Sequence, residues 1–209
     1  MTRQQLKSMA KEQIKGKIGI LFLISLIISL ISSAASAIPG VGSIAVAVVV
    51  GPAFSLAIVR IYLAITKGTT PVIKDAFSCF NEFFPAFKTS FLVSIFTFLW
   101  SLLFVIPGII KGISYSQAMY ILAENPTIGA REAINRSKAM MEGHKMEYFI
   151  LSLSFIGWAI LACFTFGLLY IWLIPYMSAT FTNYYNSLKP VVIAEEPAAE
   201  EAPAAEVTE

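Results

Sequence analysis

Few residues of this 209-residue chain have the types and spacing that catalysis or metal binding requires. The sole histidine, His144, lies in the polar segment 142–145, so no second imidazole can share a metal ion with it. The two cysteines, Cys79 and Cys163, form no Cys-x-x-Cys motif, and we expect them to be buried or chemically idle. Nucleophile-elbow, zinc-protease, phosphate-loop and dinucleotide motifs are missing from the sequence. The sequence therefore predicts no catalytic residue, no metal site and no cofactor.

Two cations inside long apolar runs are the candidate intramembrane polar groups. Arg60 lies seven residues before Lys67, so its guanidinium can extend along the helix to the headgroups. Lys111 shares a helical face with Ser114 and Tyr115, and it either lines a polar cleft with Tyr115 or reaches the outer headgroups. The predicted spans contain no Asp or Glu away from their ends. Their absence argues against a proton-coupled transporter, which needs such a group inside the membrane.

The N-terminal segment 1–17 has the pattern of an amphipathic helix. Its basic residues recur at every fourth position: Arg3, Lys7, Lys11 and Lys15. Apolar residues follow the same period on a neighbouring face: Leu6, Ala10, Ile14 and Ile18. Such a helix suits the surface of an anionic membrane, where these cations would contact lipid phosphates. The alternative is a solvated basic anchor that holds the chain's orientation.

Two polar segments between apolar runs also predict helices. In the first, Thr70-Pro71 is a good helix start, and large apolar residues then share one face: Ile73, Phe77, Phe80, Phe84 and Phe87. We expect Phe77, Phe80 and Phe84 to contact lipid, and Pro85 to end or kink this helix.

The second polar segment has a similar design. Asn125-Pro126 is expected to open a helix in which Glu132 pairs with Arg136 and in which Ile134 and Met141 face inward. Packing within the protein is the alternative role for both apolar faces.

The composition indicates a membrane protein. Hydrophobic residues make up 57% of the chain and charged residues 13%, with a mean hydropathy of +0.74, whereas soluble domains carry about 25% charged residues. This excludes an ordinary cytosolic protein, a disordered chain and a nucleic-acid-binding domain. The predicted fold class is all-α: a polytopic membrane bundle with cytoplasmic amphipathic helices and six transmembrane helices at 18–38, 44–66, 89–106, 108–124, 148–166 and 168–188. The expected breaks are Ile38-Pro39-Gly40, Ile106-Pro107-Gly108 and Gly167.

The distribution of charge predicts the orientation. Residues 1–188 hold 14 Lys and Arg against seven Asp and Glu, and most of these cations lie before the first span or in the two long loops. By the positive-inside rule, both termini and both loops are cytoplasmic. Residues 189–209 hold six Glu against Lys189 and predict a disordered acidic tail. Cleavage after the Ala35-Ser36-Ala37 motif is an alternative, but the apolar sequence continues past it.

Several motifs together resemble an uncharacterised family of bacterial integral membrane proteins, domain of unknown function 975. They are Ile106-Pro107-Gly108-Ile109-Ile110, Tyr120 to Pro126, Met141-Glu142-Gly143-His144-Lys145 and Trp172-Leu173-Ile174-Pro175-Tyr176. The resemblance implies an all-helical, multi-spanning protein and assigns no activity. The chain is loosely similar to the membrane domain of some glycerophosphodiester phosphodiesterases, without their catalytic domain.

These observations favour a non-enzymatic, lipid-contacting scaffold of the bacterial plasma membrane, with anionic lipids as its partners. The second hypothesis is a transporter or channel component, which the intramembrane Arg60 and Lys111 would serve. The sequence predicts neither a ligand, nor a protein partner, nor an oligomeric state.

Overall fold

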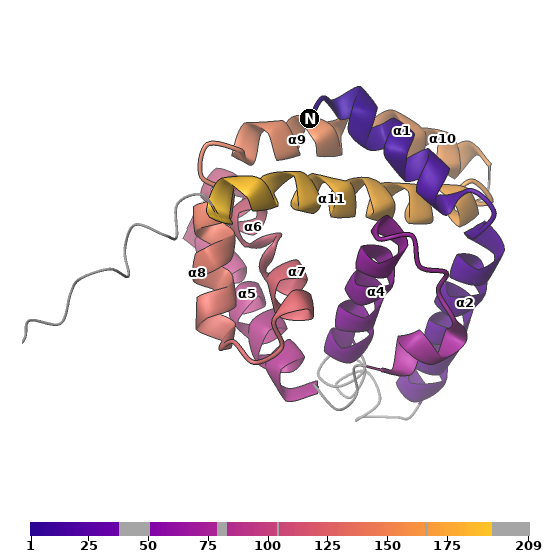
Figure 1. Ribbon diagram of the computed structural model, residues 1–209. Helices are drawn as coiled ribbons and strands as arrows, with labels where there is room; N and C mark the ends of the chain where they lie inside the picture. The colour runs from indigo at the N-terminus through magenta and orange to yellow at the C-terminus, as the bar shows by residue number, and fades with distance from the viewer. Residues whose placement is uncertain (38–50, 79–82, 104, 166, 194–209) are drawn as a thin grey trace, which may run out of the picture.

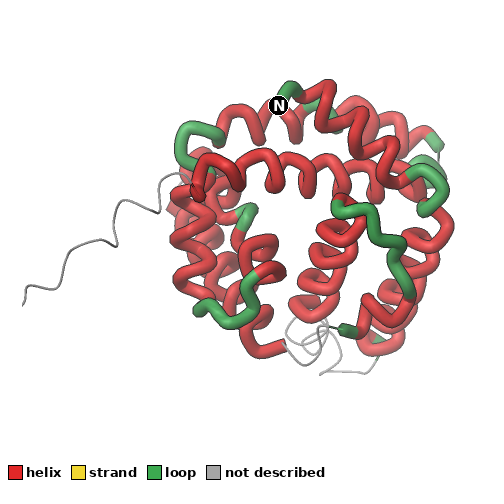
Figure 2. The backbone as a smooth tube through the Cα atoms, viewed as in Figure 1, coloured by secondary structure: helices red, strands yellow, loops and turns green. Residues whose placement is uncertain are grey.

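The computed structural model describes residues 1–37, 51–78, 83–103, 105–165 and 167–193. Every regular element within these ranges is helical, as Figure 2 shows, so the all-α fold class is confirmed. In chain order the elements are α1 (Arg3–Ile14), α2 (Ile18–Ser36), α4 (Gly51–Thr66), the 3-10 helix η2 (Ile73–Phe77), α5 (Phe83–Leu103), α6 (Val105–Tyr115), α7 (Ala118–Glu124), α8 (Ala130–Met140), α9 (Lys145–Leu153), α10 (Ile156–Phe164) and α11 (Tyr170–Ile193).

The helices form two sets that cross each other. In Figure 1, α1, α9, α10 and α11 run across the top of the molecule, and α2, α4, α5 and α8 stand beneath them. The axis of α1 is bent by 85° from that of α2, which places these consecutive helices in different sets. Helix α11 packs along α1 and also against α4. The largest hydrophobic core lies where the two sets meet.

Helix α1 owes its position to its apolar face. Thr2 and Gln5 form a reciprocal capping box that starts the helix. Leu6, Ala10 and Ile14 are buried, at 2%, 0% and 1% exposure. The predicted apolar stripe therefore packs inside the protein, and only the basic stripe remains available to lipid.

Helices occupy all six segments that were predicted to span the membrane, but fewer of them meet the requirements for a span. Within the described residues, Phe83–Leu102 and Lys145–Phe164 are long and apolar enough to cross a bilayer. The bent pair α1 and α2 would add a third if it formed one broken span. Helix α4 has only 16 residues, and the predicted fourth span is divided between α6 and α7. The count of six spans therefore stays a prediction.

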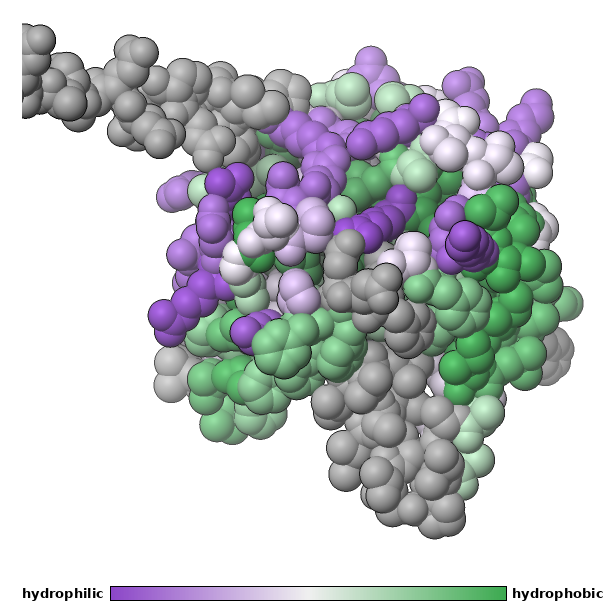
Figure 3. All heavy atoms as spheres, turned by 60° about the horizontal axis from the view of Figure 1, so that its bottom comes forward, coloured by the Kyte–Doolittle hydropathy of each residue, from purple (hydrophilic) through white to green (hydrophobic). Residues whose placement is uncertain are grey.

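The surface of the molecule separates apolar from polar side chains. Figure 3 shows hydrophobic side chains over the flank formed by α2, while hydrophilic side chains gather in the upper part of that view. Large side chains on α2, α5, α6 and α10 are strongly exposed, among them Leu30 (59%), Phe98 (66%), Ile106 (71%) and Phe164 (79%). Water would solvate such a surface poorly, whereas lipid would cover it favourably.

Three predictions about proline were wrong. Pro85 neither ends nor kinks its helix but lies in the first turn of α5, where its missing N–H has no partner to lose. Pro107 likewise lies in the first turn of α6, which begins at Val105, so residues 106–108 lie within a helix rather than between two helices. Asn125-Pro126 forms the turn after α7 instead of opening α8, which begins at Ala130.

The cap predicted at Thr70-Pro71 was also wrong. The element there begins at Ile73, because the Asp75 carboxylate accepts a hydrogen bond from the Val72 N–H (2.9 Å) and fixes the start two residues later. By contrast, Gly167 adopts a φ of +84° between α10 and α11, where a break was predicted, and Gly143 adopts a φ of +77° in the turn after α8.

The end of α11 differs from the predicted boundary of the tail. The helix continues to Ile193, although the tail was predicted to start at residue 189. Residues 194–209, which hold all six glutamates of the predicted tail, lie outside the described part of the chain.

Candidate functional site

The ends of three helices converge on one carboxylate. Glu124 is the last residue of α7, Lys67 directly follows α4, and Lys189 lies in the last turns of α11. Exposed carbonyl groups give each helix a partial negative charge at its C-terminus, so a carboxylate there needs nearby cations. The site therefore joins one acidic group to two lysines that come from distant parts of the chain.

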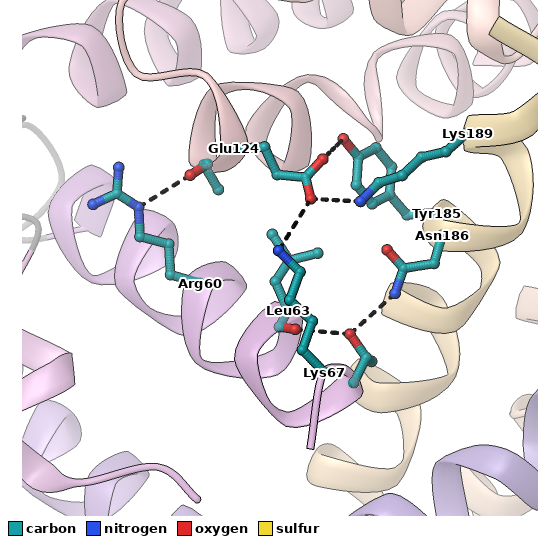
Figure 4. A network of polar contacts seen from close by, with 9 residues as sticks. Arg60, Leu63, Lys67, Glu124, Tyr185, Asn186 and Lys189 are labelled. Carbon is teal, nitrogen blue, oxygen red and sulfur yellow. Dashed lines mark hydrogen bonds and ion pairs between the residues drawn. The ribbon is translucent and has the colours of Figure 1, made fainter. Parts of the chain in front are cut away.

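Both carboxylate oxygens of Glu124 accept hydrogen bonds from α11, whereas the residue after α4 makes only a distant ionic contact. Its Oε1 atom accepts a hydrogen bond from Lys189 Nζ, and its Oε2 atom accepts one from Tyr185 Oη at 2.8 Å (Figure 4). Lys67 Nζ lies 4.0 Å from the same Oε1 atom, at the outer limit of an ion pair. The side chain of Lys67 is 68% exposed and that of Glu124 22% exposed. Lys189 is thus the tight partner of Glu124, and Lys67 remains in contact with solvent.

Three further hydrogen bonds fix the geometry around this carboxylate. Asn186 Nδ2 donates to Thr66 Oγ1 at 3.0 Å, and Thr66 Oγ1 donates to the Leu63 carbonyl at 2.8 Å, so α11 is tied to the end of α4 (Figure 4). Arg60 Nε donates to the Ala123 carbonyl at 3.2 Å and so satisfies one of the last carbonyls of α7. Arg60 therefore holds α4 against α7.

A cavity of about 470 Å³ lies beside this network. Its polar lining consists of Arg60, Lys67, Thr69 and Glu124, and Leu63 and Ala64 belong to its apolar wall. The loop that follows α4 forms part of its border: Gly68 adopts a φ of +89°, and the Thr69 N–H donates to the Ala64 carbonyl at 3.0 Å. The result is a polar, cation-rich recess with an apolar side.

The basic stripe of α1 forms a second cluster of charge. Arg3, Lys11 and Lys15 are exposed, and the ion pairs among the described residues include none of the four stripe cations. Lys7 Nζ lies 4.4 Å from the centre of the Phe155 ring, and Lys11 Nζ lies 5.7 Å from that of Tyr176.

One amine of this stripe, that of Lys7, has a lowered pKa. Partial burial lowers the pKa of the Lys7 amine, and the nearby positive charges of Arg3 and Lys11 lower it further. The cluster is thus positive and would gain from an anionic counter-charge.

Two of the phenylalanines predicted to contact lipid, Phe77 and Phe84, lie on different elements. Phe77 is 41% exposed and packs edge-on against Phe54 in the first turn of α4, with ring centres 5.9 Å apart. Phe84 is 60% exposed, and Lys88 Nζ lies 4.3 Å from its ring centre. Phe80 lies outside the described residues. Phe77 and Phe84 belong to separate elements, so the single amphipathic helix predicted for this segment was wrong.

The remaining polar candidates of the apolar runs lie apart from Arg60. Lys111 Nζ lies 4.7 Å from the centre of the Trp100 ring. Tyr115 is buried at 4% exposure, and its ring lies 6.3 Å from that of Phe96. Tyr115 thus contributes to a packed cluster, while Lys111 is covered by an aromatic ring.

Four other residues named in the sequence predictions, together with Arg136, contact neighbouring residues within the protein or are buried in it. Glu132 and Arg136 form the predicted ion pair, with Arg136 Nη2 2.9 Å from Glu132 Oε1. Ile134 and Met141 face inward as predicted, at 1% and 0% exposure. His144 Nδ1 lies 3.2 Å from Glu147 Oε2.

The cysteines and the possible metal ligands form no recognisable site among the described residues. Cys163 is exposed on α10 and so is not buried, its chemical idleness stays a prediction, and Cys79 lies outside the described residues. Among the described residues, no group of three or more His, Cys, Asp or Glu side chains could hold a metal ion.

Glu124, Tyr185 and Lys189 carry no sequence motif that marks them as parts of one site. A signal was nevertheless present, because Glu124 and Lys189 each end a charge-free run, at 112–123 and at 148–188. Opposite charges at the ends of apolar runs are natural partners when those runs pack side by side.

The chain matches one family of proteins. The model of the family described as "Protein of unknown function (DUF975)" matches residues 1–111 and residues 102–191. No curated protein and no solved structure matches the chain. The looser similarity to the membrane domain of glycerophosphodiester phosphodiesterases gains no support from these comparisons.

Proposed function

The chain belongs to the DUF975 family of proteins of unknown function, and we propose that it is an integral membrane protein that contacts anionic lipid and organises the membrane around it. In this proposal it is a scaffold that catalyses no reaction. The chemistry required is limited to an apolar surface that lipid tails cover and a basic surface that lipid phosphates neutralise.

The observation that carries the proposal is the outward orientation of the two helical stretches that are long and apolar enough to cross a bilayer. Only 11% of the Phe83–Leu102 window and 17% of the Lys145–Phe164 window are buried inside the protein. Apolar surface stabilises a fold only when it is removed from water, at about 25 cal/mol per Å². Lipid tails supply that environment along α5 and along α9 and α10.

The basic stripe of α1 supports the preference for anionic lipid. Its four cations, Arg3, Lys7, Lys11 and Lys15, lack ion pairs among the described residues, and Lys7 is crowded by its neighbours. Each basic residue close to an anionic leaflet gains about 1 kcal/mol. Phosphate groups would relieve the repulsion within the stripe.

The orientation in this proposal follows the charge pattern of the sequence. The protein lies in the bacterial plasma membrane with several spans, six by the apolar runs, and with both termini in the cytoplasm. The excess of Lys and Arg in the N-terminal segment and in the long polar segments supports this orientation.

The lipid that remains bound to purified protein tests the proposal. Protein extracted in mild detergent should retain phosphatidylglycerol in excess over phosphatidylethanolamine, as measured by mass spectrometry of the bound lipids. Changing Arg3, Lys7, Lys11 and Lys15 together to Gln should lower this preference at least tenfold. A matched variant with Arg3→Lys and the three lysines changed to Arg should keep it. An unchanged preference in the Gln variant would contradict the lipid-contacting role.

A transporter or channel component is the second candidate, favoured by the 470 Å³ cavity that Arg60 lines. A transporter should move a solute into proteoliposomes down or against a gradient. Arg60→Gln or Lys111→Gln should abolish this movement. Such a flux would overturn the scaffold proposal.

A further inference from the structure

The cavity beside Glu124 has the charge of an anion site. Its lining residues include two cations, Arg60 and Lys67, against one carboxylate. That carboxylate is already bonded to Lys189 and Tyr185 of α11. Glu124 is therefore bonded mainly to α11, and Lys67 keeps only a distant ionic contact to it, at 4.0 Å.

Lys67 is the cation most able to bind an incoming group. Its ammonium offers three hydrogen-bond donors, yet its ionic contact to Glu124 spans 4.0 Å and its side chain is 68% exposed. An ammonium held this loosely can turn toward a ligand oxygen without breaking a strong bond. Arg60 lies on α4, seven residues before Lys67, and its side chain also lines the recess.

A third cation lies at the border of the cavity. Lys17 Nζ donates to the Thr69 carbonyl at 3.0 Å, and Thr69 lines the recess. This bond fixes the loop after α4 against the start of α2. The recess thus has a preformed rim, and its apolar wall includes Leu63 and Ala64.

We propose that this recess binds the phosphate group of an anionic ligand, with Lys67 as the direct contact. The apolar wall suits the uncharged part of such a ligand. The phosphate can belong to the headgroup of a glycerophospholipid or to a water-soluble phosphoester, and only the first source rests on the membrane role proposed above. The site is separate from the basic stripe of α1.

Binding to purified protein in detergent tests this site with two probes, dioleoylphosphatidylglycerol and inorganic phosphate. Native mass spectrometry measures the first and isothermal titration calorimetry the second. Lys67→Gln should weaken binding of at least one probe about tenfold, the scale of one charge-assisted hydrogen bond. Lys67→Arg should retain binding, and Lys111→Gln, which removes a cation over Trp100, should leave it unchanged.

The probes separate the two sources of phosphate. Tight binding of the lipid with weak binding of inorganic phosphate assigns a lipid headgroup, and the reverse assigns a soluble phosphoester. Equal affinities of Lys67→Gln and the unchanged protein for both probes would overturn the inference, as would a loss that Lys111→Gln reproduces. Melting temperatures of all variants must agree, so that a loss of binding is not a loss of fold.

The Lys67 test and the test on the basic stripe of α1 can fail independently of each other. If the α1 Gln variant loses its preference for anionic lipid while Lys67→Gln binds both probes normally, the cavity inference fails and the scaffold proposal stands. If Lys67→Gln loses phosphate binding while the α1 variant keeps its lipid preference, the scaffold proposal fails and the cavity inference stands.

Discussion

Helices α4 and α5 have similar apolar sequences but opposite surroundings. Nine residues of α4 are buried, including Leu56 and Ala57 at 0% exposure. In α5, only 11% of the apolar window is buried, and Phe98 and Leu102 are 66% and 74% exposed. Hydropathy alone therefore cannot distinguish a helix that forms the centre of the protein from one that covers its outside.

The partners of each helix explain this difference. Helix α4 contacts α7, α11, α5 and η2, so neighbours cover most of its circumference. Helix α5 contacts α6 most and α8, α4 and α7 less, yet side chains such as Phe98 and Leu102 remain strongly exposed. Along α5, the rings of Phe83, Phe87 and Phe91 stack on one another, with centres 5.8 and 5.6 Å apart. The row ends at Phe91, whose side chain is 54% exposed.

Truncating one leucine in each helix should give the largest contrast. Leu56→Ala in α4 should lower the free energy of unfolding by about 2–5 kcal/mol, because it leaves a cavity among packed neighbours. Leu102→Ala in α5 should cost less than about 0.5 kcal/mol in detergent, since its side chain is already outside the protein. Thermal unfolding followed by circular dichroism measures both. Equal losses would show that α5 is as buried as α4.

A glycine substitution where α5 meets α6 should have the next largest effect. A Cβ atom on Gly108 would lie 2.2 Å from Ser101 Oγ and 2.7 Å from Ser101 Cα, so the backbones would have to separate. Gly108→Ala should therefore destabilise the protein by about 1–3 kcal/mol. On the same helix, a Cβ atom on Gly112 would meet Thr97 Cγ2 at 3.6 Å, an ordinary contact.

Gly112→Ala is thus the matched control. It should be neutral or stabilising by up to about 1 kcal/mol, because alanine favours the helix. The same melting experiment measures both variants. A Gly108→Ala variant as stable as the unchanged protein would mean that α5 and α6 do not approach each other this closely.

The smallest expected effect concerns the basic stripe of α1. The pKa of Lys7 lies below its ordinary value of 10.5 in the folded protein, so between these two pKa values the unfolded chain binds more protons. Stability should therefore rise as the pH rises through this window toward 10.5. Lys7→Met should remove this rise and should stabilise the protein at neutral pH by less than about 1 kcal/mol.

Lys15→Met is the control for Lys7, because Lys15 is exposed and its ammonium contacts no ring among the described residues. Unfolding at a series of pH values in detergent measures both. A fall in stability as the pH rises, present with Lys7 and absent without it, would contradict the expected direction of this pH dependence.

The sequence predicted the helices well and their surroundings poorly. Helix periodicity identified the buried stripe Leu6, Ala10 and Ile14, and local pairing identified Glu132 with Arg136, because both depend on residues three to four positions apart. The prolines were misassigned because the first turn of a helix tolerates proline as well as a break does. The Glu124 site was missed because its partners Lys67 and Lys189 are brought together only where α4 packs against both α7 and α11.

The central claim is that lipid covers the outward apolar surface of α5 and of α9 and α10, and Cys163 offers a direct probe of it. This thiol is exposed on α10, and Cys79→Ser makes it the sole cysteine of the chain. A fluorescent label attached to Cys163 in detergent can be reconstituted into liposomes and exposed either to spin-labelled lipid or to aqueous iodide. A label on Glu132→Cys of α8, combined with Cys79→Ser and Cys163→Ser, is the matched control in water. The account predicts strong quenching of the Cys163 label by the lipid and weak quenching by iodide, with the reverse on α8. Strong iodide quenching at Cys163 would contradict it.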